Sequence, residues 1–207
     1  MLRVLHLYHR PPAGRPIRVA WTLEEVGAEW DLTLLDRESS KSPEHLARQP
    51  LGRVPALAFE DGTLFESAAI CLQLADLHPE SGLAPPLGTR ERGLVYQWAV
   101  FVPAELEPPL IGASFEFRDD PERRRSALGR FVNGREVVAN ALGDSEYLVG
   151  DRLTIADVLV ATTLAWVVAA GRADTLPANL LAYTERLTAR EPFQRANARL
   201  TPAAPTS

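Results

Sequence analysis

The chain has 207 residues, of which 46% are hydrophobic and 24% are charged, and its formal net charge is −5. This length allows one large domain or two small ones around a hydrophobic core, while the negative charge argues against a groove for nucleic acid. The single cysteine, Cys71, excludes an internal disulfide and a multi-cysteine metal site. No apolar stretch approaches the roughly 20 residues of a membrane span. Taken together, these features predict a cytoplasmic protein that contacts neither membrane nor nucleic acid and holds no metal.

The first 80 residues alternate between strand-like and helical segments. Apolar residues at helical spacing, with Pro16 at the start and Gly27 at the end, predict the first helix. The residues Glu60-Asp61-Gly62-Thr63 predict a turn between two antiparallel strands. The complete order is β-α-β-α-β-β-α, with elements predicted at Leu2–Leu7, Pro16–Gly27, Trp30–Leu35, Ser42–Arg48, Val54–Phe59, Thr63–Phe65 and Ser67–Leu77.

The second part of the chain carries no convincing strand. Residues 79–88 are rich in proline and glycine and predict a linker. A long helix is predicted over Thr89–Phe115, and we expect it to bend around Pro103 or at Pro108-Pro109. Three later helices are predicted at Asp120–Leu142, Thr154–Ala170 and Leu180–Arg190, and the tail after Leu200 is expected to be disordered.

The helix that starts after Thr154 carries a clear start signal. Thr154 is a suitable N-cap, and Asp157, three residues later, can reach back to the Thr154 N–H as a carboxylate version of the capping box. We therefore expect Asp157 to be buried and to serve folding, not chemistry.

Two features within residues 50–67 together predict a slot for a small, extended ligand that carries a carboxylate. The first is Val54-Pro55 at the entry to a strand, where a cis bond costs about 0.5–1 kcal/mol over trans. A cis bond there turns the backbone N–H and C=O of Val54 outward, so that an extended peptide can pair with them. The second is Glu66-Ser67 at the start of a helix, where free N–H groups and the helix dipole favour a carboxylate.

This spacing, in this order of elements, resembles the glutathione S-transferase family, and the resemblance covers nearly the whole chain. It implies a thioredoxin-like N-terminal domain over residues 1–79 and an all-helical C-terminal domain, a helical bundle, over residues 89–200. It also implies glutathione as the co-substrate, with Val54 and Pro55 against its cysteinyl unit and Glu66 and Ser67 at its γ-glutamyl end. Relatives form homodimers through the segments that match Ser67–Leu77 and Thr89–Phe115.

The resemblance assigns further contacts to the glycyl end of glutathione. Arg53 holds the basic position that often meets the glycyl carboxylate in relatives, and Lys41 or His45 can reach the same group. Gln49 stands where the family usually has an asparagine.

The chain departs from the family at the group that stabilises the glutathione thiolate, because residues 9–21 contain no Ser, Thr or Cys. Three substitutes are open: the hydroxyl of Tyr8, the backbone N–H of Gly14 or Arg15 at the helix start, and the guanidinium of Arg15. Cys71 lies between Ile70 and Leu72 inside a predicted helix, and we expect a buried core thiol there.

The resemblance implies an enzyme that binds glutathione, stabilises its thiolate and adds it to a small hydrophobic electrophile. The C-terminal domain would supply the electrophile pocket, with Phe101, Glu105 and Trp166 among its walls. Two alternatives stay open. One is a glutathione-dependent thiol–disulfide or peroxide reductase of the same fold, and the other is a non-catalytic binding or structural module.

Overall fold

The computed structural model describes residues 5–12 and 14–201 and divides the chain into two compact units. Of the described residues, those up to 84 and those from 189 to 201 form the first unit, and residues 85–188 form the second. The predicted domains, 1–79 and 89–200, differ from these units at the C-terminal end, where residues 189–201 belong to the first unit. The start of the predicted strand at Leu2 and the tail beyond residue 201 lie outside the described residues.

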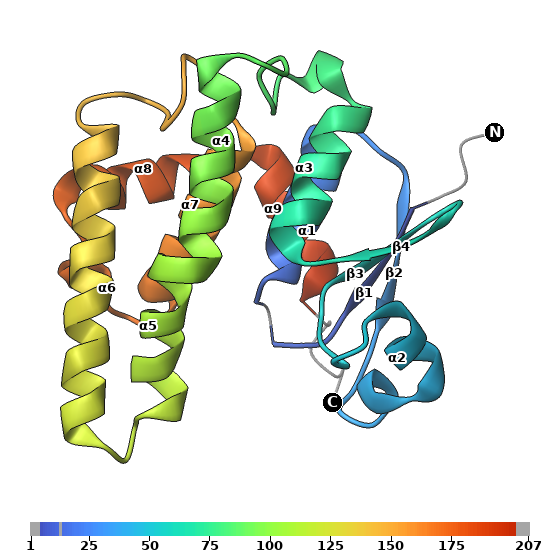
Figure 1. Cartoon of the computed structure of the whole chain (residues 1–207), viewed down its shortest axis with the longest axis horizontal. Coiled ribbons are helices and arrows are strands. Elements are labelled where there is room, and N and C mark those ends of the chain that lie inside the picture. Colours follow the sequence, from blue (N-terminus) through green and yellow to red (C-terminus); the bar gives the residue numbers. More distant parts are fainter. Residues whose placement is uncertain (1–4, 13, 202–207) are drawn as a thin grey trace. The chain divides into compact units, whose positions relative to one another are not determined.

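A four-stranded mixed sheet forms the centre of the first unit (Figure 1). Its strands, in the spatial order β2-β1-β3-β4, are Leu5–His9 (β1), Trp30–Leu34 (β2), Ala56–Phe59 (β3) and Gly62–Phe65 (β4). Strand β1 runs parallel to β2 and antiparallel to β3, which forms a hairpin with β4. Three helices complete the predicted β-α-β-α-β-β-α order: Pro16–Glu25 (α1), Pro43–Arg48 (α2) and Ser67–Leu77 (α3). The thioredoxin-like fold is thereby confirmed.

The helices cover opposite faces of this sheet, with α2 on one side and α1 and α3 on the other (Figure 1). Side chains alternate between the faces of a strand. On β1, Leu7 and His9 are fully buried, whereas Tyr8 contacts the α2 residues His45 and Arg48. The face of β1 that bears Tyr8 is therefore the α2 face.

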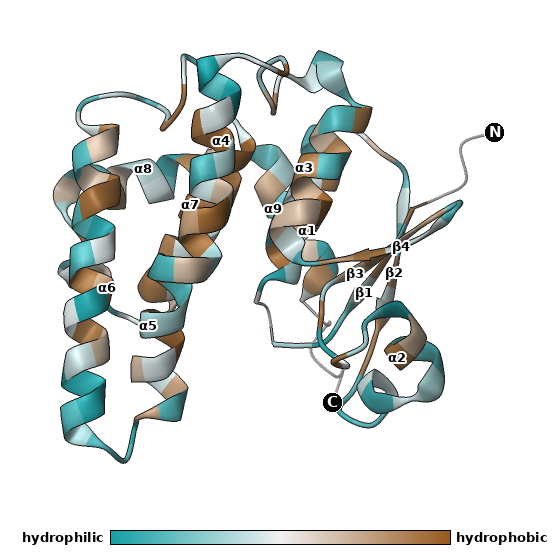
Figure 2. Cartoon of the chain, in the orientation of Figure 1, coloured by the Kyte–Doolittle hydropathy of each residue, from teal (hydrophilic) through white to brown (hydrophobic). Residues whose placement is uncertain are grey.

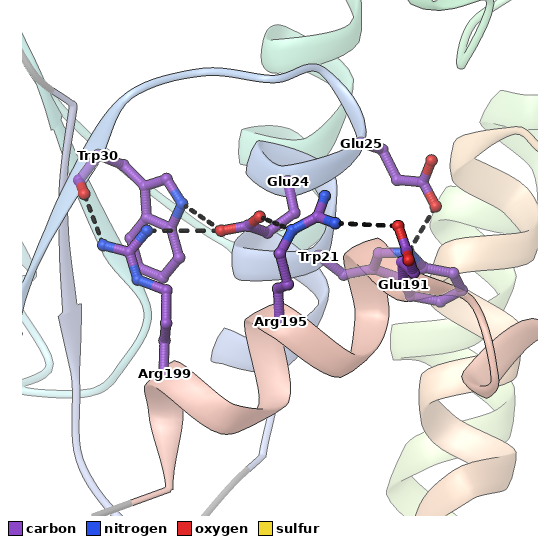
Figure 3. A network of polar contacts seen from close by, with 7 residues as sticks. All are labelled: Trp21, Glu24, Glu25, Trp30, Glu191, Arg195 and Arg199. Atoms are coloured by element: carbon purple, nitrogen blue, oxygen red, sulfur yellow. Dashed lines mark hydrogen bonds and ion pairs between the residues drawn. The ribbon is translucent and has the colours of Figure 1, made fainter.

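Helix α9, Glu191–Leu200, was not predicted from the sequence, and it packs on α1. The ring of Phe193 meets the buried Trp21 edge-on at 5.2 Å between centroids. Polar contacts surround this packing, as Figure 3 shows: Arg195 pairs with Glu24 at 2.8 Å, and Arg199 donates to the Trp30 carbonyl at 2.7 Å. These contacts are the reason why the C-terminal segment belongs to the first unit.

The second unit is all-helical, as predicted, and its first long segment is interrupted. Helix Arg90–Phe101 (α4) passes into a π-helical turn at Val102–Leu106, then into Glu107–Ile111 (α5) and a second π-helical turn at Gly112–Glu116. Proline lacks the N–H that the helical ladder needs, and Pro103 lies within the first wide turn. We predicted a bend around Pro103 or at Pro108-Pro109; the structure has a wide turn that includes Pro103, whereas Pro108 and Pro109 lie within α5.

The remaining helices of this unit are Pro121–Leu142 (α6), Ile155–Ala169 (α7) and Ala178–Thr188 (α8). Most residues of α7 are buried, in keeping with its largely brown colour in Figure 2. The predicted role of Asp157 is confirmed: the side chain is fully buried, and its Oδ2 accepts the Thr154 N–H at 2.8 Å. Within the described part of the chain, no helix combines the length and apolarity that crossing a bilayer requires.

Candidate functional site

The strand register brings three predicted site segments to one end of the sheet in the first unit. Ala56 on β3 pairs with Tyr8 on β1 and with Phe65 on β4. Continued by one residue, this register places Pro55 between His9 and Glu66. Three segments therefore start from neighbouring strand ends: the loop that leads to Gly14, the Val54-Pro55 pair and the Glu66-Ser67 pair.

The loop before Val54 is held by side chains from the α2 region. The amide oxygen of Gln49, a buried residue, accepts the N–H groups of Leu51 at 2.8 Å and Arg53 at 2.9 Å. The ammonium of Lys41 donates to the Leu51 carbonyl at 2.8 Å, and His45 Nε2 donates to the Arg53 carbonyl at 2.8 Å. Lys41, His45 and Gln49 thus shape the loop around Arg53.

Gly52 explains why this loop needs a glycine. Its φ is +60°, a conformation that favours glycine. A Cβ there would also lie 2.6 Å from the Ser40 carbonyl oxygen and 2.8 Å from Cδ of Lys41. Both the backbone conformation and the space exclude a side chain.

Val54 and Pro55 form the entry to β3. The Val54–Pro55 peptide bond is cis; Pro55 is buried and Val54 half-buried. Among the described residues, the backbone N–H and C=O of Val54 have no hydrogen-bond partner. They are available to an added extended chain, as a ligand that pairs like a strand requires.

Glu66 and Ser67 lie at the start of α3. Glu66 has a φ of +69°, which is unusual for a residue other than glycine. Backbone of this kind costs about 1–3 kcal/mol and concentrates at ligand-binding positions. Ser67 is the first residue of α3, and its buried Oγ accepts from Nη1 of Arg18 at 3.4 Å.

Sequence reasoning missed Arg18 as a neighbour of this site. Arg18 lies on α1 and is fully buried, although arginine is seldom buried. Its position between Ile17 and Val19, within a run of buried residues, was the available signal.

Gly14 and Arg15 immediately precede α1. Arg15 is the N-cap residue and Pro16 opens the helix. Ile17 and Arg18 donate their N–H groups back to the carbonyls of Gly14 and Arg15. A Cβ placed on Gly14 would meet no heavy atom within 4 Å among the described residues. There is therefore space beside Gly14 for a neighbouring group.

Tyr8 lies on the other face of the sheet from α1. Its ring stacks on His6 at 4.8 Å between centroids, and the Arg48 guanidinium lies over it at 4.5 Å. The ring of His45 is 6.0 Å away. Through these contacts the Tyr8 ring packs beneath α2.

The predicted electrophile residues belong to the second unit. Phe101, at the end of α4, is half-buried and meets Trp98 edge-on at 5.3 Å. Glu105, in the first π-helical turn, is exposed and lies 3.9 Å from Arg130. Trp166 is half-buried on α7. Phe101 thus contacts a ring on its own helix, and Glu105 lies near an arginine of α6.

Cys71 does not contribute reactive chemistry. The residue is fully buried in α3, as predicted, and burial raises the pKa of its thiol to about 11. Within residues 5–12 and 14–201, no group of three or more His, Cys, Asp or Glu side chains is arranged to hold a metal ion.

Comparison with known proteins adds an independent line of support. The family profile "Glutathione S-transferase, N-terminal domain" matches residues 3–76, and "Glutathione S-transferase, C-terminal domain" matches residues 97–186. A glutathione S-transferase from Xanthomonas campestris pv. campestris is 32% identical over 148 residues, covering 69% of this chain and 72% of its own length.

Solved structures agree. A glutathione transferase from Methylococcus capsulatus superimposes with a TM-score of 0.81 at 32% identity, over 95% of this chain and 98% of its own. A sphingomonad glutathione S-transferase complexed with glutathione gives a TM-score of 0.82 at 25% identity, over 96% of this chain and 100% of its own. With both domains matched in sequence and in fold, the chain belongs to the glutathione S-transferase family.

Proposed function

We propose that this protein is an enzyme that binds glutathione, stabilises its thiolate and adds it to a small hydrophobic electrophile. The observation that carries the proposal is the pair of Val54 backbone groups without partners, next to the strand end that leads to Glu66 and Ser67. A peptide backbone and a carboxylate, at the spacing that glutathione offers, match these two features.

The binding mode follows from the groups at the sheet end. The cysteinyl unit of glutathione pairs with the backbone of Val54, ahead of Pro55. The γ-glutamyl carboxylate binds the Ser67 hydroxyl and the first N–H groups of α3, where the helix dipole favours negative charge. At the glycyl end, Arg53 is exposed and can pair with the carboxylate, whereas Lys41 and Gln49 act mainly through the loop that they hold.

The burial of His45 decides whether this residue can contact the glycyl end of glutathione. Its side chain is fully buried and its Nε2 is committed to the Arg53 carbonyl. The alternative in which His45 reaches the glycyl carboxylate is therefore not retained.

We assign thiolate stabilisation to the backbone before α1 and to the Arg15 guanidinium, ahead of Tyr8. Lowering the thiol pKa by two units needs about 2.7 kcal/mol of differential stabilisation. N–H groups at a helix start and a fixed cation can supply this without a hydroxyl. Tyr8 packs among His6, His45 and Arg48 on the α2 face, which supports a packing role.

The second unit would supply the electrophile site through Phe101, Glu105 and Trp166. We further propose a cytoplasmic homodimer formed through α3 and α4. Exposed apolar side chains on these helices, Leu77 on α3 and Tyr96 and Val100 on α4, support that assignment.

The test is a glutathione titration at neutral pH that follows bound ligand by calorimetry and thiolate by ultraviolet absorbance. Binding with ionisation, followed by turnover of an aryl halide, is the expected result. Ionisation with turnover of disulfides or peroxides only would favour the reductase alternative. Binding without ionisation would favour a non-catalytic module, and absence of binding would overturn the proposal.

A further inference from the structure

We infer that His45 is a positioning residue of the glutathione site, because it fixes the peptide plane that carries the Val54 N–H. The inference rests on the proposed function, in which that N–H pairs with the cysteinyl unit of glutathione. A buried histidine of α2 would thereby orient the backbone N–H that glutathione contacts.

The hydrogen bond to the Arg53 carbonyl shows which ring nitrogen of His45 carries a hydrogen. Nε2 lies 2.8 Å from the carbonyl oxygen of Arg53. A carbonyl can only accept, so Nε2 carries the proton, and in the neutral ring Nδ1 carries none. Nδ1 is buried and has no hydrogen-bond partner within the described part of the chain. The ring therefore has one polar task, which is to hold the Arg53 carbonyl.

The Arg53 carbonyl and the Val54 N–H belong to the same peptide group. A peptide group is planar, and in its trans form the C=O and N–H point in opposite directions. The bond from His45 thus turns the Val54 N–H away from α2. A hydrogen bond accepted by a peptide carbonyl also polarises the group and strengthens its N–H as a donor.

The preceding peptide plane is held separately. The Arg53 N–H donates to Oε1 of Gln49 at 2.9 Å, and Gly52, one residue earlier, is confined by Ser40 and Lys41. With that plane fixed, the peptide group between Arg53 and Val54 could still rotate. The hydrogen bond from His45 to the Arg53 carbonyl prevents this rotation. Loss of the His45 donor should consequently loosen Val54 without unfolding the loop.

Three variants test this assignment. His45→Leu removes the donor, His45→Gln keeps a donor at a similar reach, and His78→Leu makes the same change in the first unit at a residue whose ring contacts Glu80. Each variant is studied by calorimetric glutathione titration, by thermal unfolding, and by amide hydrogen exchange of residues 51–57 in the ligand-free protein.

We expect His45→Leu to weaken glutathione binding about tenfold and to accelerate exchange in the 51–57 segment. His45→Gln should recover most of both properties, and His78→Leu should match the natural chain. The thiolate fraction of bound glutathione should not change in His45→Leu. Equal glutathione affinity or equal exchange in His45→Leu and His45→Gln would overturn the inference.

The exchange measurement separates this inference from the proposed function. If the natural chain binds no glutathione, the proposed function fails, and with it the link from His45 to ligand affinity. Exchange that is the same in the natural chain and in His45→Leu, while glutathione still binds the natural chain, would instead overturn the positioning role alone.

Discussion

The phenol of Tyr183 donates to Oδ1 of Asp157 at 2.8 Å and thereby joins α8 to the start of α7. The same carboxylate accepts the backbone N–H groups of Leu148 and Thr154 and the Thr154 hydroxyl, each within 2.9 Å. Burial raises the pKa of Asp157, and these four hydrogen bonds oppose the rise. One carboxylate thus gathers three segments of the second unit.

Replacement of Asp157 should strongly destabilise the protein. Asp157→Ala would leave four buried donors without an acceptor, at a cost of at least about 3 kcal/mol in the free energy of unfolding. Tyr183→Phe removes one of these bonds and should cost about 1 kcal/mol. Urea denaturation measures both, with the exposed Asp151→Ala as the control. A loss in Asp157→Ala no larger than in Tyr183→Phe would contradict the assigned role.

Ser67→Ala and Glu66→Ala should each weaken glutathione binding without unfolding the protein. Loss of a hydrogen bond to a charged group costs about 1.5–3 kcal/mol, which is about a tenfold to hundredfold increase in Kd. Calorimetry measures the change, and Asp61→Ala, an exposed acid in the β3–β4 turn, is the matched control. Unchanged affinity in both variants would refute the assignment of this end of the site.

Arg15→Ala should lower the thiolate fraction of bound glutathione at neutral pH more than Tyr8→Phe. The physical reason is that the Arg15 guanidinium is a fixed positive charge at the start of α1, whereas Tyr8 packs under α2. A spectroscopic pH titration of bound glutathione gives the thiol pKa in each variant. The opposite order would make the Tyr8 hydroxyl the thiol donor.

Stability should fall as the pH drops below about 6.5, in part because of His9. Burial lowers the pKa of this imidazole below its ordinary value near 6.5, and the nearby Leu200 carbonyl offsets this only partly. Above that value the ring is neutral in both folded and unfolded chains, so the free energy of unfolding does not depend on it. Below that value the unfolded chain binds the proton first, and stability is lost.

The measurement for His9 is urea denaturation at several pH values between 5 and 8. His9→Phe should give a shallower loss of stability toward low pH than the natural chain. His78→Phe, at a partly exposed histidine, should leave the slope nearly unchanged. Equal slopes in the natural chain and in His9→Phe would show that His9 does not carry the effect.

Local sequence signals predicted most of the fold. The α3 limits, Ser67–Leu77, agree with the prediction, and Pro103, one of the two places at which a bend was predicted, lies in a π-helical turn. Asp157 and Cys71 were also predicted to be buried. For the limits of α3, the turn at Pro103 and the contacts between Asp157 and Thr154, the determining interaction lies within a few residues of the chain, so that spacing and residue type contain the information.

Contacts between residues far apart in the sequence could be read only from the folded chain. The arginines of α9 are typical of an exposed helix, yet Arg195 pairs with Glu24 on α1 (Figure 3). Arg190, the residue just before α9, pairs with Glu25 on the same helix. Similarly, no local pattern distinguishes a surface histidine from the buried His45 that holds the Arg53 carbonyl. Periodicity determines which face of an element is buried, but the partner of each polar group depends on which elements pack together.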